Sequence, residues 1–240
     1  MIKLEKKESI YFLTMDAGEN RWNTTFVREI AKALDTIEDD EGQGALITSS
    51  TDSKFFSNGL DLEWMQAPED HPDGGDREVF GEEFMYLMGR FITLPIPTVC
   101  ALNGHTFGAG FMFALSHDFR IMREDKGFIC ANEMQLGLPI PRPELALFKH
   151  KIPANAFFET VQLSKRWTGA DALKAGIVQG VSSFEELSEA ALRKAKELAP
   201  LANNRKNFGH QKEMLYGENA AINLAHGPAH MLKNSKYFEV

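Results

Sequence analysis

The features of this sequence that most clearly indicate a chemical function are one glutamate and two glycine-containing turns. Glu133 follows the β-rich run FICAN and precedes MQLGLP, so its carboxylate is expected in partly apolar surroundings. Burial disfavours the charged form of a carboxyl group and raises its pKa, which suits a general base working near neutral pH. A glutamate at a loop entry also commonly lies on the surface, and this residue alone leaves both interpretations open.

The two turns are SNGLD, around Gly59, and GHTFGAG, around Gly108 and Gly110. Glycine permits a tight backbone in each, and a helix is expected directly afterwards. The amides of Leu60 and Ala109 are therefore free to face a ligand. Two such amides directed at one oxygen atom would form an oxyanion hole. A glycine before a helix more often serves packing or chain punctuation, so each turn taken singly is weak evidence.

Composition narrows the class of protein. The 240 residues are 43% hydrophobic and 25% charged, which is ordinary for a globular chain. The formal charge of −8 and the lack of a Lys/Arg block argue against a nucleic-acid partner. We find no apolar stretch near the ~18 residues of a membrane span, no signal peptide and no C-terminal Ser-Lys-Leu. We therefore expect no membrane partner and a cytoplasmic location.

The sequence gives little support for a reactive cysteine, a metal site or a serine nucleophile. Cys100 and Cys130 each lie in an apolar run and are expected to be buried free thiols. His226 and His230 have the four-residue spacing of some metal-binding pairs, but no third ligand accompanies them, so no metal site is predicted. Ser57 precedes Asn-Gly and does not lie in the GxSxG turn of a serine nucleophile.

The hydrophobic pattern predicts a β/α region of about 150 residues followed by helices. Residues 10–15, 45–50 and 98–102 are typical of strands, and apolar residues at 26, 30, 34 and 37 predict a helix capped by Thr24 or Thr25. Asp61 is well placed to cap the helix after Gly59. Prolines at 139, 141 and 143 predict an irregular segment, and residues 67–78 predict an acidic loop that includes His71.

Together these motifs resemble the crotonase, or enoyl-CoA hydratase/isomerase, superfamily. The matching runs are FFSNGLDL at 55–62, NGHTFGAG at 103–110, SHDFRIM at 116–122, and Asn132-Glu133 followed by LGLP at 136–139. Several motifs in series make the resemblance specific, and it covers roughly residues 10–180. Runs such as KFFSNGLDL and LGLPIP are most similar to the monofunctional enoyl-CoA isomerases of plants.

The resemblance implies an α/β fold, a crotonase-like spiral of repeated ββα units with a helical C-terminal layer. Residues 1–180 would form the core with an acyl-CoA site, and residues 181–240 would form a helical region for oligomerisation and site closure. The resemblance also implies a homotrimer or a dimer of trimers. No cofactor is implied beyond the coenzyme A that the substrate itself carries.

The family's site residues map onto this chain one by one. The amides of Leu60 and Ala109 would hold the thioester oxygen, and Glu133 would be the single catalytic glutamate. The substrate-binding positions would be Ser57, Asn58, Gly59, Asp61, Gly108, Gly110 and Met112. Hydratases of the family carry a second glutamate at the position of Met112, and methionine cannot activate water. The resemblance therefore implies an isomerase that converts a 3-enoyl-CoA to the 2-trans-enoyl-CoA.

Some assignments stay open from the sequence alone. Candidates for the acyl channel, which are equally candidates for core packing, are Trp64, Met65, Phe84, Met88 and Phe111. Cations that could meet the CoA phosphates include Lys54, Arg77, Arg142 and the C-terminal lysines. The alternatives to isomerisation are another crotonase reaction, such as hydrolysis or hydration, and a non-catalytic acyl-CoA-binding protein.

Overall fold

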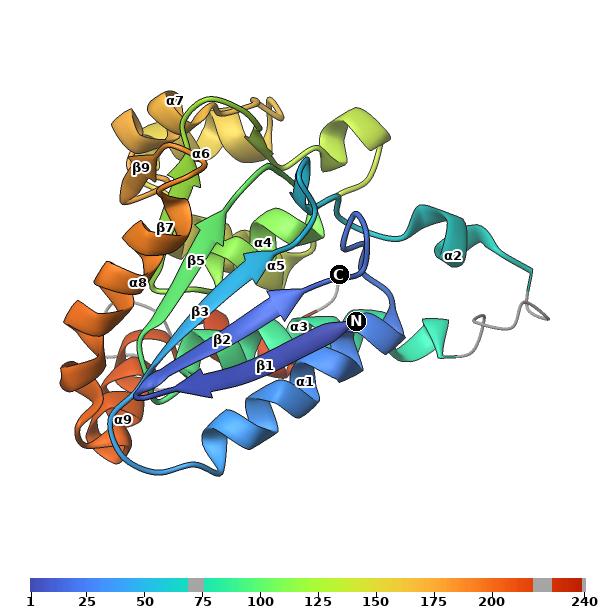
Figure 1. The fold of residues 1–240 in the computed structure, drawn as a ribbon. Helices are drawn as coiled ribbons and strands as arrows, with labels where there is room; N and C mark the ends of the chain where they lie inside the picture. Colours follow the sequence, from blue (N-terminus) through green and yellow to red (C-terminus); the bar gives the residue numbers. More distant parts are fainter. Residues whose placement is uncertain (69–75, 218–225, 239–240) are drawn as a thin grey trace.

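Two sheets form the frame of the molecule (Figure 1). The computed structural model describes residues 1–68, 76–217 and 226–238, so the predictions for His71, for most of the acidic loop and for part of the C-terminal segment lie outside the described residues. In the larger sheet β1 is antiparallel to β2 and the other neighbours are parallel. Its strands, in spatial order, are β1 (Ile2–Lys7), β2 (Ile10–Met15), β3 (Ala45–Ser50), β5 (Thr98–Leu102), β7 (Phe119–Arg123) and β9 (Gly180–Ser182).

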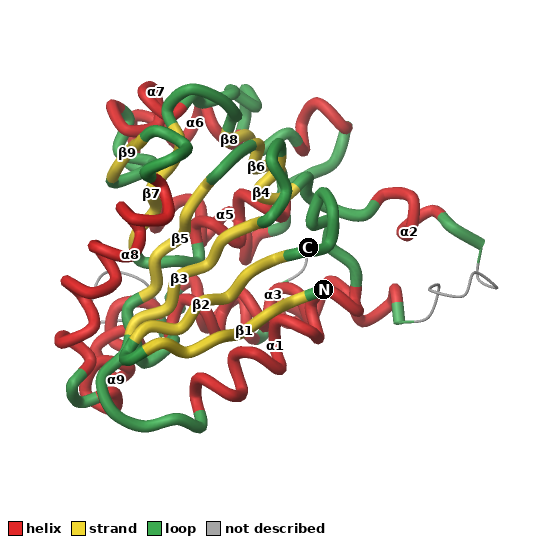
Figure 2. Tube along the Cα trace, in the orientation of Figure 1, coloured by secondary structure: helices red, strands yellow, loops and turns green. Residues whose placement is uncertain are grey.

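The chain alternates between the larger sheet and a small one as it winds. The small parallel sheet consists of β4 (Phe55–Ser57), β6 (His105–Phe107) and β8 (Ile129–Cys130). Each of β3, β5 and β7 in the large sheet is followed by one of these three strands. Helices then complete the successive turns, so the fold is a spiral of ββα units, as the sequence resemblance implies (Figure 2).

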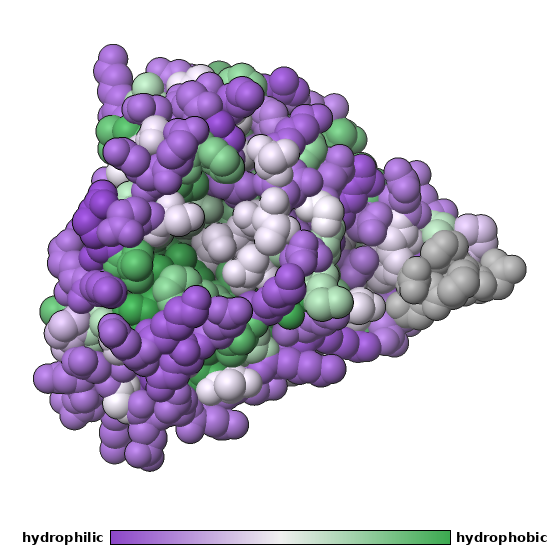
Figure 3. Space-filling view, viewed as in Figure 1, coloured by the Kyte–Doolittle hydropathy of each residue, from purple (hydrophilic) through white to green (hydrophobic). Residues whose placement is uncertain are grey.

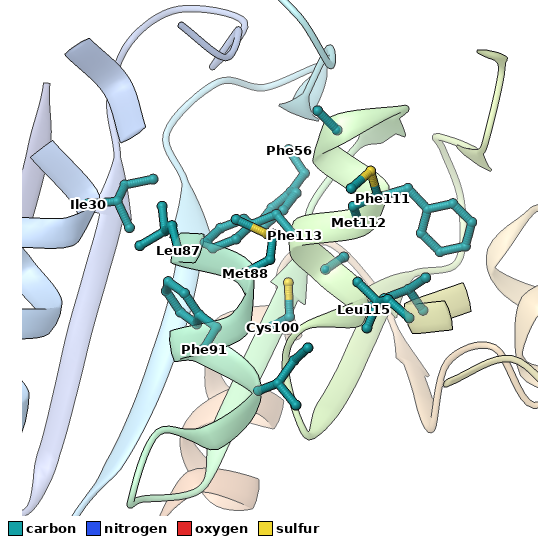
Figure 4. Packing of buried hydrophobic residues seen from close by; sticks show 14 of the residues in the cluster. Ile30, Phe56, Leu87, Met88, Phe91, Cys100, Phe111, Met112, Phe113 and Leu115 are labelled. Atoms are coloured by element: carbon teal, nitrogen blue, oxygen red, sulfur yellow. The ribbon is translucent and has the colours of Figure 1, made fainter. Parts of the chain in front are cut away.

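Helices cover one face of the large sheet and enclose the main core. They include α1 (Thr24–Glu38), α3 (Arg77–Thr93), α4 (Ala109–Leu115) and α5 (Arg142–Lys151). Phe113 of α4 packs edge-on against Phe91 of α3, with ring centroids 4.8 Å apart. Figure 4 shows Phe113 pointing toward α3, whereas Phe111 points to the other side of α4, where its ring meets Phe148 of α5 at 5.4 Å.

The opposite face of the large sheet packs against α8 (Leu187–Leu198). Leu187 and Ala191 of this helix are buried against side chains from β3, β5 and β7. Phe12 and Phe119 are only partly buried beside them, and Figure 3 shows apolar surface on this face. The boundary predicted at 180/181 falls inside β9, and α8 contributes directly to the core of the sheet.

Further α-helices lie in the C-terminal half of the chain. They are α6 (Ala154–Val161), α7 (Gly169–Lys174), α9 (Arg205–Tyr216) and α10 (Pro228–Lys233). Cys100 and Cys130 are buried free thiols, as predicted. Among the described residues, none of the helices combines the length and the apolar character that a bilayer-spanning segment needs.

Two local predictions are wrong. The N-cap of α1 is Asn23, whose side chain accepts a hydrogen bond from the amide of Phe26, because Thr24 and Thr25 already lie inside the first turn. The segment predicted to be irregular becomes helical at Arg142, and Pro143 lies in the first turn of α5, where a missing amide costs nothing. The prediction for Asp61 is confirmed, because its side chain accepts from the amide of Trp64 at the start of α2 (Leu62–Gln66).

Candidate active site

The two glycine turns lie side by side at the end of the small sheet. Gly59 follows β4 with a φ of +82°, and Gly108 follows β6 with a φ of +49°. Because β4 and β6 are adjacent parallel strands, both chains leave the sheet in the same direction. A Cβ atom on Gly59 would lie 2.9 Å from the carbonyl oxygen of Phe107 and 3.8 Å from the amide nitrogen of Ala109. Only glycine therefore fits at position 59.

The amides of Leu60 and Ala109 are free for a ligand. Within the described part of the chain, no hydrogen bond uses either N–H group as a donor. Ala109 is the first residue of α4, where amides have no partner inside the helix. The carbonyl of Gly59 accepts from the amide of Trp22, and this contact holds the turn in place. Two unpaired amides at adjacent turns match the donor arrangement of an oxyanion hole.

Glu133 faces the same turns from the third strand of the small sheet. It begins the short 3-10 helix η1 (Glu133–Leu136), directly after β8. A Cβ atom on Gly108 would lie 3.2 Å from its Oε1 atom. The buried Oε2 atom has no hydrogen-bond partner among the described residues. Burial raises the pKa of Glu133 above its ordinary value, and the hydrogen bond from its own amide only partly opposes this shift.

A cleft of about 200 Å³ opens between these groups. Of the predicted site residues, six line it: Asn58, Gly59, Leu60, Gly108, Ala109 and Glu133. The cleft thus joins both free amides to one partly desolvated carboxylate. This arrangement can stabilise negative charge on a carbonyl oxygen and move a proton beside it. Within the described residues, no group of three His, Cys, Asp or Glu side chains is placed to hold a metal ion.

The sequence profile of the enoyl-CoA hydratase/isomerase family matches residues 5–224. This chain belongs to that family. It is 32% identical to enoyl-CoA delta isomerase 2, peroxisomal, of Arabidopsis thaliana over 227 residues. The matched region covers 92% of this chain and 95% of that relative. Carnitinyl-CoA dehydratase of Salmonella typhi is 33% identical over 172 residues, 70% of this chain and 63% of that protein.

Solved structures support the fold of this family member. The human mitochondrial delta3-delta2-enoyl-CoA isomerase superposes with a TM-score of 0.82, at 24% sequence identity, covering 98% of this chain and 87% of that one. The crotonase spiral that the sequence motifs imply is therefore confirmed as the fold.

The other predicted site residues lie behind the cleft and do not line it. The hydroxyl of the buried Ser57 donates to the carbonyl of Asn20 at 2.7 Å and accepts from the indole N–H of Trp22 at 3.1 Å and the Gly59 amide at 3.3 Å. Ser57 thereby holds the Gly59 turn. Asp61 lies on the surface side of that turn, where it caps α2.

Gly110 and Met112 belong to the packing of α4. A Cβ atom on Gly110 would lie 2.6 Å from the Cβ atom of Ser57, so glycine allows α4 to approach β4 closely. Met112 is 1% exposed within the main apolar core. The position at which the family resemblance places the second glutamate of a hydratase is therefore occupied by a core side chain here.

The apolar wall of the cleft is built from residues that the sequence analysis missed. Trp64, Phe84, Met88 and Phe111, which were candidates for the acyl channel, are buried in the core, and Met65 is exposed. The side chains that line the cleft, beyond the predicted ones, are Arg21, Leu62, Asn132, Leu136 and Leu138. The sequence could have pointed to two of them, because Leu136 and Leu138 are apolar residues only a few positions after Glu133; both are exposed in the structure.

Proposed function

We propose that this protein is a Δ3,Δ2-enoyl-CoA isomerase. The observation that carries the proposal is the meeting of one partly buried carboxylate, Glu133, with the unpaired amides of Leu60 and Ala109 in one cleft. The relatedness to plant enoyl-CoA delta isomerases over nearly the whole chain supports the same activity. The chemistry needs no cofactor beyond the coenzyme A of the substrate and no metal ion.

The reaction would proceed through a stabilised enolate. The thioester oxygen of a 3-enoyl-CoA accepts hydrogen bonds from the two amides, which acidifies the C2–H bond. The Glu133 carboxylate takes the C2 proton, and the electron pair of that bond spreads over the dienolate to the oxygen. The neutral Glu133 then returns the proton to C4, which gives the 2-trans-enoyl-CoA and restores the carboxylate. Protons and charge balance without a water molecule entering the product.

Arg21 extends the site toward a charged ligand. It lines the cleft next to Asn58, and its backbone position is set because the neighbouring Trp22 pairs with Leu60 in a parallel bridge. Its guanidinium contacts Glu19 at 2.8 Å and Glu63 at 3.4 Å. We propose that this cation binds the CoA phosphates, together with one or more of the candidates Lys54, Arg77 and Arg142. A phosphate would compete with the exposed Glu63 for Arg21.

Turnover of 3-hexenoyl-CoA by the Glu133→Gln variant tests the proposal. The amide cannot act as a base, so we expect 2-enoyl-CoA formation to fall by about a hundredfold or more. Glu41→Gln, at an exposed glutamate before β3, is the matched control and should keep wild-type activity. Mass spectrometry and chromatography of the products follow both variants.

The products also separate the alternatives. Free CoA as the main product would favour a hydrolase, and 3-hydroxyacyl-CoA would favour a hydratase. Binding of the acyl-CoA without turnover would favour a non-catalytic binding protein. Each of these outcomes contradicts the isomerase proposal.

The acid limb of the pH profile gives a further check on Glu133. A general base must be ionised in the free enzyme, so kcat/KM should fall as the pH drops through the pKa of Glu133. Because burial raises this pKa, the midpoint should lie above the ordinary value of about 4.5. A rate that stays constant down to pH 4.5 would exclude Glu133 as the base.

Assembly and location remain predictions. We propose a homotrimer or a dimer of trimers, with the helical region 181–240 contributing to contacts between subunits and to closure of the site. The partly buried Phe12 and Phe119 beside α8 support an apolar contact surface. Light scattering on the purified protein would give the mass of the assembly. A cytoplasmic location is likewise still a prediction, and the names of two of the plant relatives include the word peroxisomal.

A further inference from the structure

Asn132 brings a second polar side chain to the cleft beside Glu133, and the mechanism above gives it no role. Arg21 and Asn58 are the other polar side chains of the cleft wall. Both are already occupied, because Arg21 pairs with Glu19 and the side-chain amide of Asn58 donates to Glu19 at 2.8 Å. The side-chain amide of Asn132 makes no hydrogen bond with any residue that the structure describes. Its two N–H donors are therefore free for a group inside the cleft.

The backbone at Gly108 brings the side chains of Asn132 and Glu133 to the same place. A Cβ atom on Gly108 would lie 3.4 Å from Oδ1 of Asn132 and 3.2 Å from Oε1 of Glu133. Both oxygen atoms thus approach one point above the turn that precedes the Ala109 amide. Glycine at position 108 leaves this space open, and a larger residue would press on both side chains. The amide of Asn132 therefore lies at the same edge of the cleft as the proposed base.

The amide group of Asn132 can present either its oxygen or its NH₂ group to this space. Rotation by 180° about the Cβ–Cγ bond exchanges the two with almost no change in shape. Oδ1 of Asn132 and the oxygens of a charged Glu133 are all acceptors, so they repel one another. An NH₂ group beside the carboxylate instead forms a charge-assisted hydrogen bond. The charged form of Glu133, whose Oε2 atom has no partner among the described residues, therefore favours the orientation that places the NH₂ group toward it.

The charged groups around Glu133 do not take over this role. Burial is the main cause that raises the pKa of Glu133, and within the described residues no charged side chain shifts it. Arg21, across the cleft, already contacts two carboxylates of its own. Cys130 of β8 and Glu144 of α5 respond to the charge of Glu133, and burial is the main cause that raises their pKa values to about 11 and about 8. Both therefore stay neutral up to about neutral pH and add no charge beside the base.

We propose that Asn132 is a positioning residue for Glu133: its NH₂ group donates to one oxygen of the carboxylate, and the other oxygen moves the proton between C2 and C4. This inference rests on the isomerase function proposed above. A hydrogen bond to the charged form lowers the pKa of a carboxyl group, so the contact opposes the effect of burial. Asn132 thereby keeps more of the base ionised near neutral pH and holds it in one orientation during the transfer.

Titration of the Glu133 carboxyl group by ¹³C NMR tests the proposal, with the resonance assigned by its absence in Glu133→Gln. Asn132→Leu removes the donor at similar volume, and we expect the pKa of Glu133 to rise by about one pH unit. Asn132→Asp keeps the shape and replaces the donor with a negative charge, so the rise should be at least as large. Asn155→Leu, at an exposed asparagine of α6, is the matched control and should leave the pKa of Glu133 unchanged.

The kinetics of the same variants give a second readout. The acid limb of kcat/KM for 3-hexenoyl-CoA should move to higher pH in both Asn132 variants, and kcat at neutral pH should fall by about tenfold, with KM changed less than about twofold. An unchanged pKa of Glu133 in both folded variants would overturn the proposal, whether or not the protein isomerises enoyl-CoA. Because Asn132→Asp conserves the shape of the side chain, the test does not depend on the folding of Asn132→Leu. A shifted pKa of Glu133 in a protein that forms no 2-enoyl-CoA would support the contact with Asn132 and contradict only the isomerase function.

Discussion

The side chain at position 112 has a structural role that affects which reactions the site can perform. Met112 is 1% exposed and lies in the same apolar cluster as Phe111 and Phe113, so its side chain is packed in the core. In the proposed mechanism a single carboxylate carries the proton, and a water molecule need not be held on the other side of the double bond. An apolar residue at position 112 is consistent with that mechanism.

Met112→Glu should therefore destabilise the fold without creating a hydratase. The new carboxyl group would be buried without a partner, which costs on the order of 3 kcal/mol in the free energy of unfolding. Met112→Leu conserves volume and apolarity and should cost less than about 1.5 kcal/mol. Urea denaturation measures both changes. A stable Met112→Glu variant that converts 2-enoyl-CoA to 3-hydroxyacyl-CoA would show that position 112 reaches the substrate.

At the scale of elements, the site depends on how closely α4 approaches β4. Gly110 in the first turn of α4 meets the side chain and the carbonyl of Ser57, and Ser57 in turn holds the Gly59 turn. A shift of α4 would move the Ala109 amide relative to the Leu60 amide. The geometry of the proposed oxyanion hole is thus set by a helix–strand contact that does not itself touch the cleft.

Gly110→Ala should reduce both stability and activity. Its Cβ atom would lie 2.6 Å from the Cβ atom and 2.9 Å from the carbonyl oxygen of Ser57, so the helix must move. Such overpacking typically costs about 1–3 kcal/mol, and we expect kcat for 3-hexenoyl-CoA to fall at least tenfold. Gly81→Ala is the control, because a Cβ atom there meets nothing within 4 Å inside α3. That variant should gain about 0.5–1 kcal/mol. Equal effects of both substitutions would contradict this account.

The elements that the sequence predicts well are those with a strong local pattern. Residues 10–15, 45–50 and 98–102 form strands, and the apolar positions from Phe26 to Ile37 face the core from α1. β9 was not predicted, because its three residues, Gly-Val-Ser, carry too little pattern to stand out from a loop. Local sequence patterns also could not predict which residues line the cleft. Arg21 and Leu138 are far apart in the chain, and only the pairing of β-strands brings such residues together.

For the whole molecule, the spiral itself assembles the site from three separate strands. Gly59, Gly108 and Glu133 each follow one of the strands β4, β6 and β8, so all three lie at the same end of the small sheet. Motifs that are far apart in the sequence therefore meet in space. For this reason the sequence distances between Glu133 and the two turns could not predict a common site, whereas the family resemblance could. The C-terminal region is joined to the same frame, because Lys212 of α9 forms an ion pair at 2.7 Å with the partly buried Asp118, which precedes β7.

A buried histidine connects this frame to α4 and should make the fold sensitive to acid. His117, just beyond α4, contacts the carbonyl of Phe113 through Nδ1 and the hydroxyl of Thr48 in β3 through Nε2, both at 2.8 Å. A neutral imidazole that donates from Nδ1 and accepts at Nε2 satisfies both contacts. Burial, opposed only in part by the Phe113 carbonyl and Asp118, lowers the pKa of His117 from 6.5 to about 3.

Protonation of His117 therefore favours the unfolded chain, where its pKa is ordinary. The stabilisation is fully present above about pH 6.5 and is lost as the pH falls toward 3, by at most about 1.4 kcal/mol for each pH unit crossed. We expect His117→Asn to be less stable at pH 7 and to lose less of its remaining stability between pH 6.5 and 4 than wild type does. His210→Asn, at an exposed histidine of α9, is the control and should follow the wild-type curve. Urea titrations across this pH range measure the slopes. If the free energy of unfolding fell equally with pH in wild type and in His117→Asn, protonation of His117 would not contribute to acid unfolding. The carboxyl groups alone would then account for it.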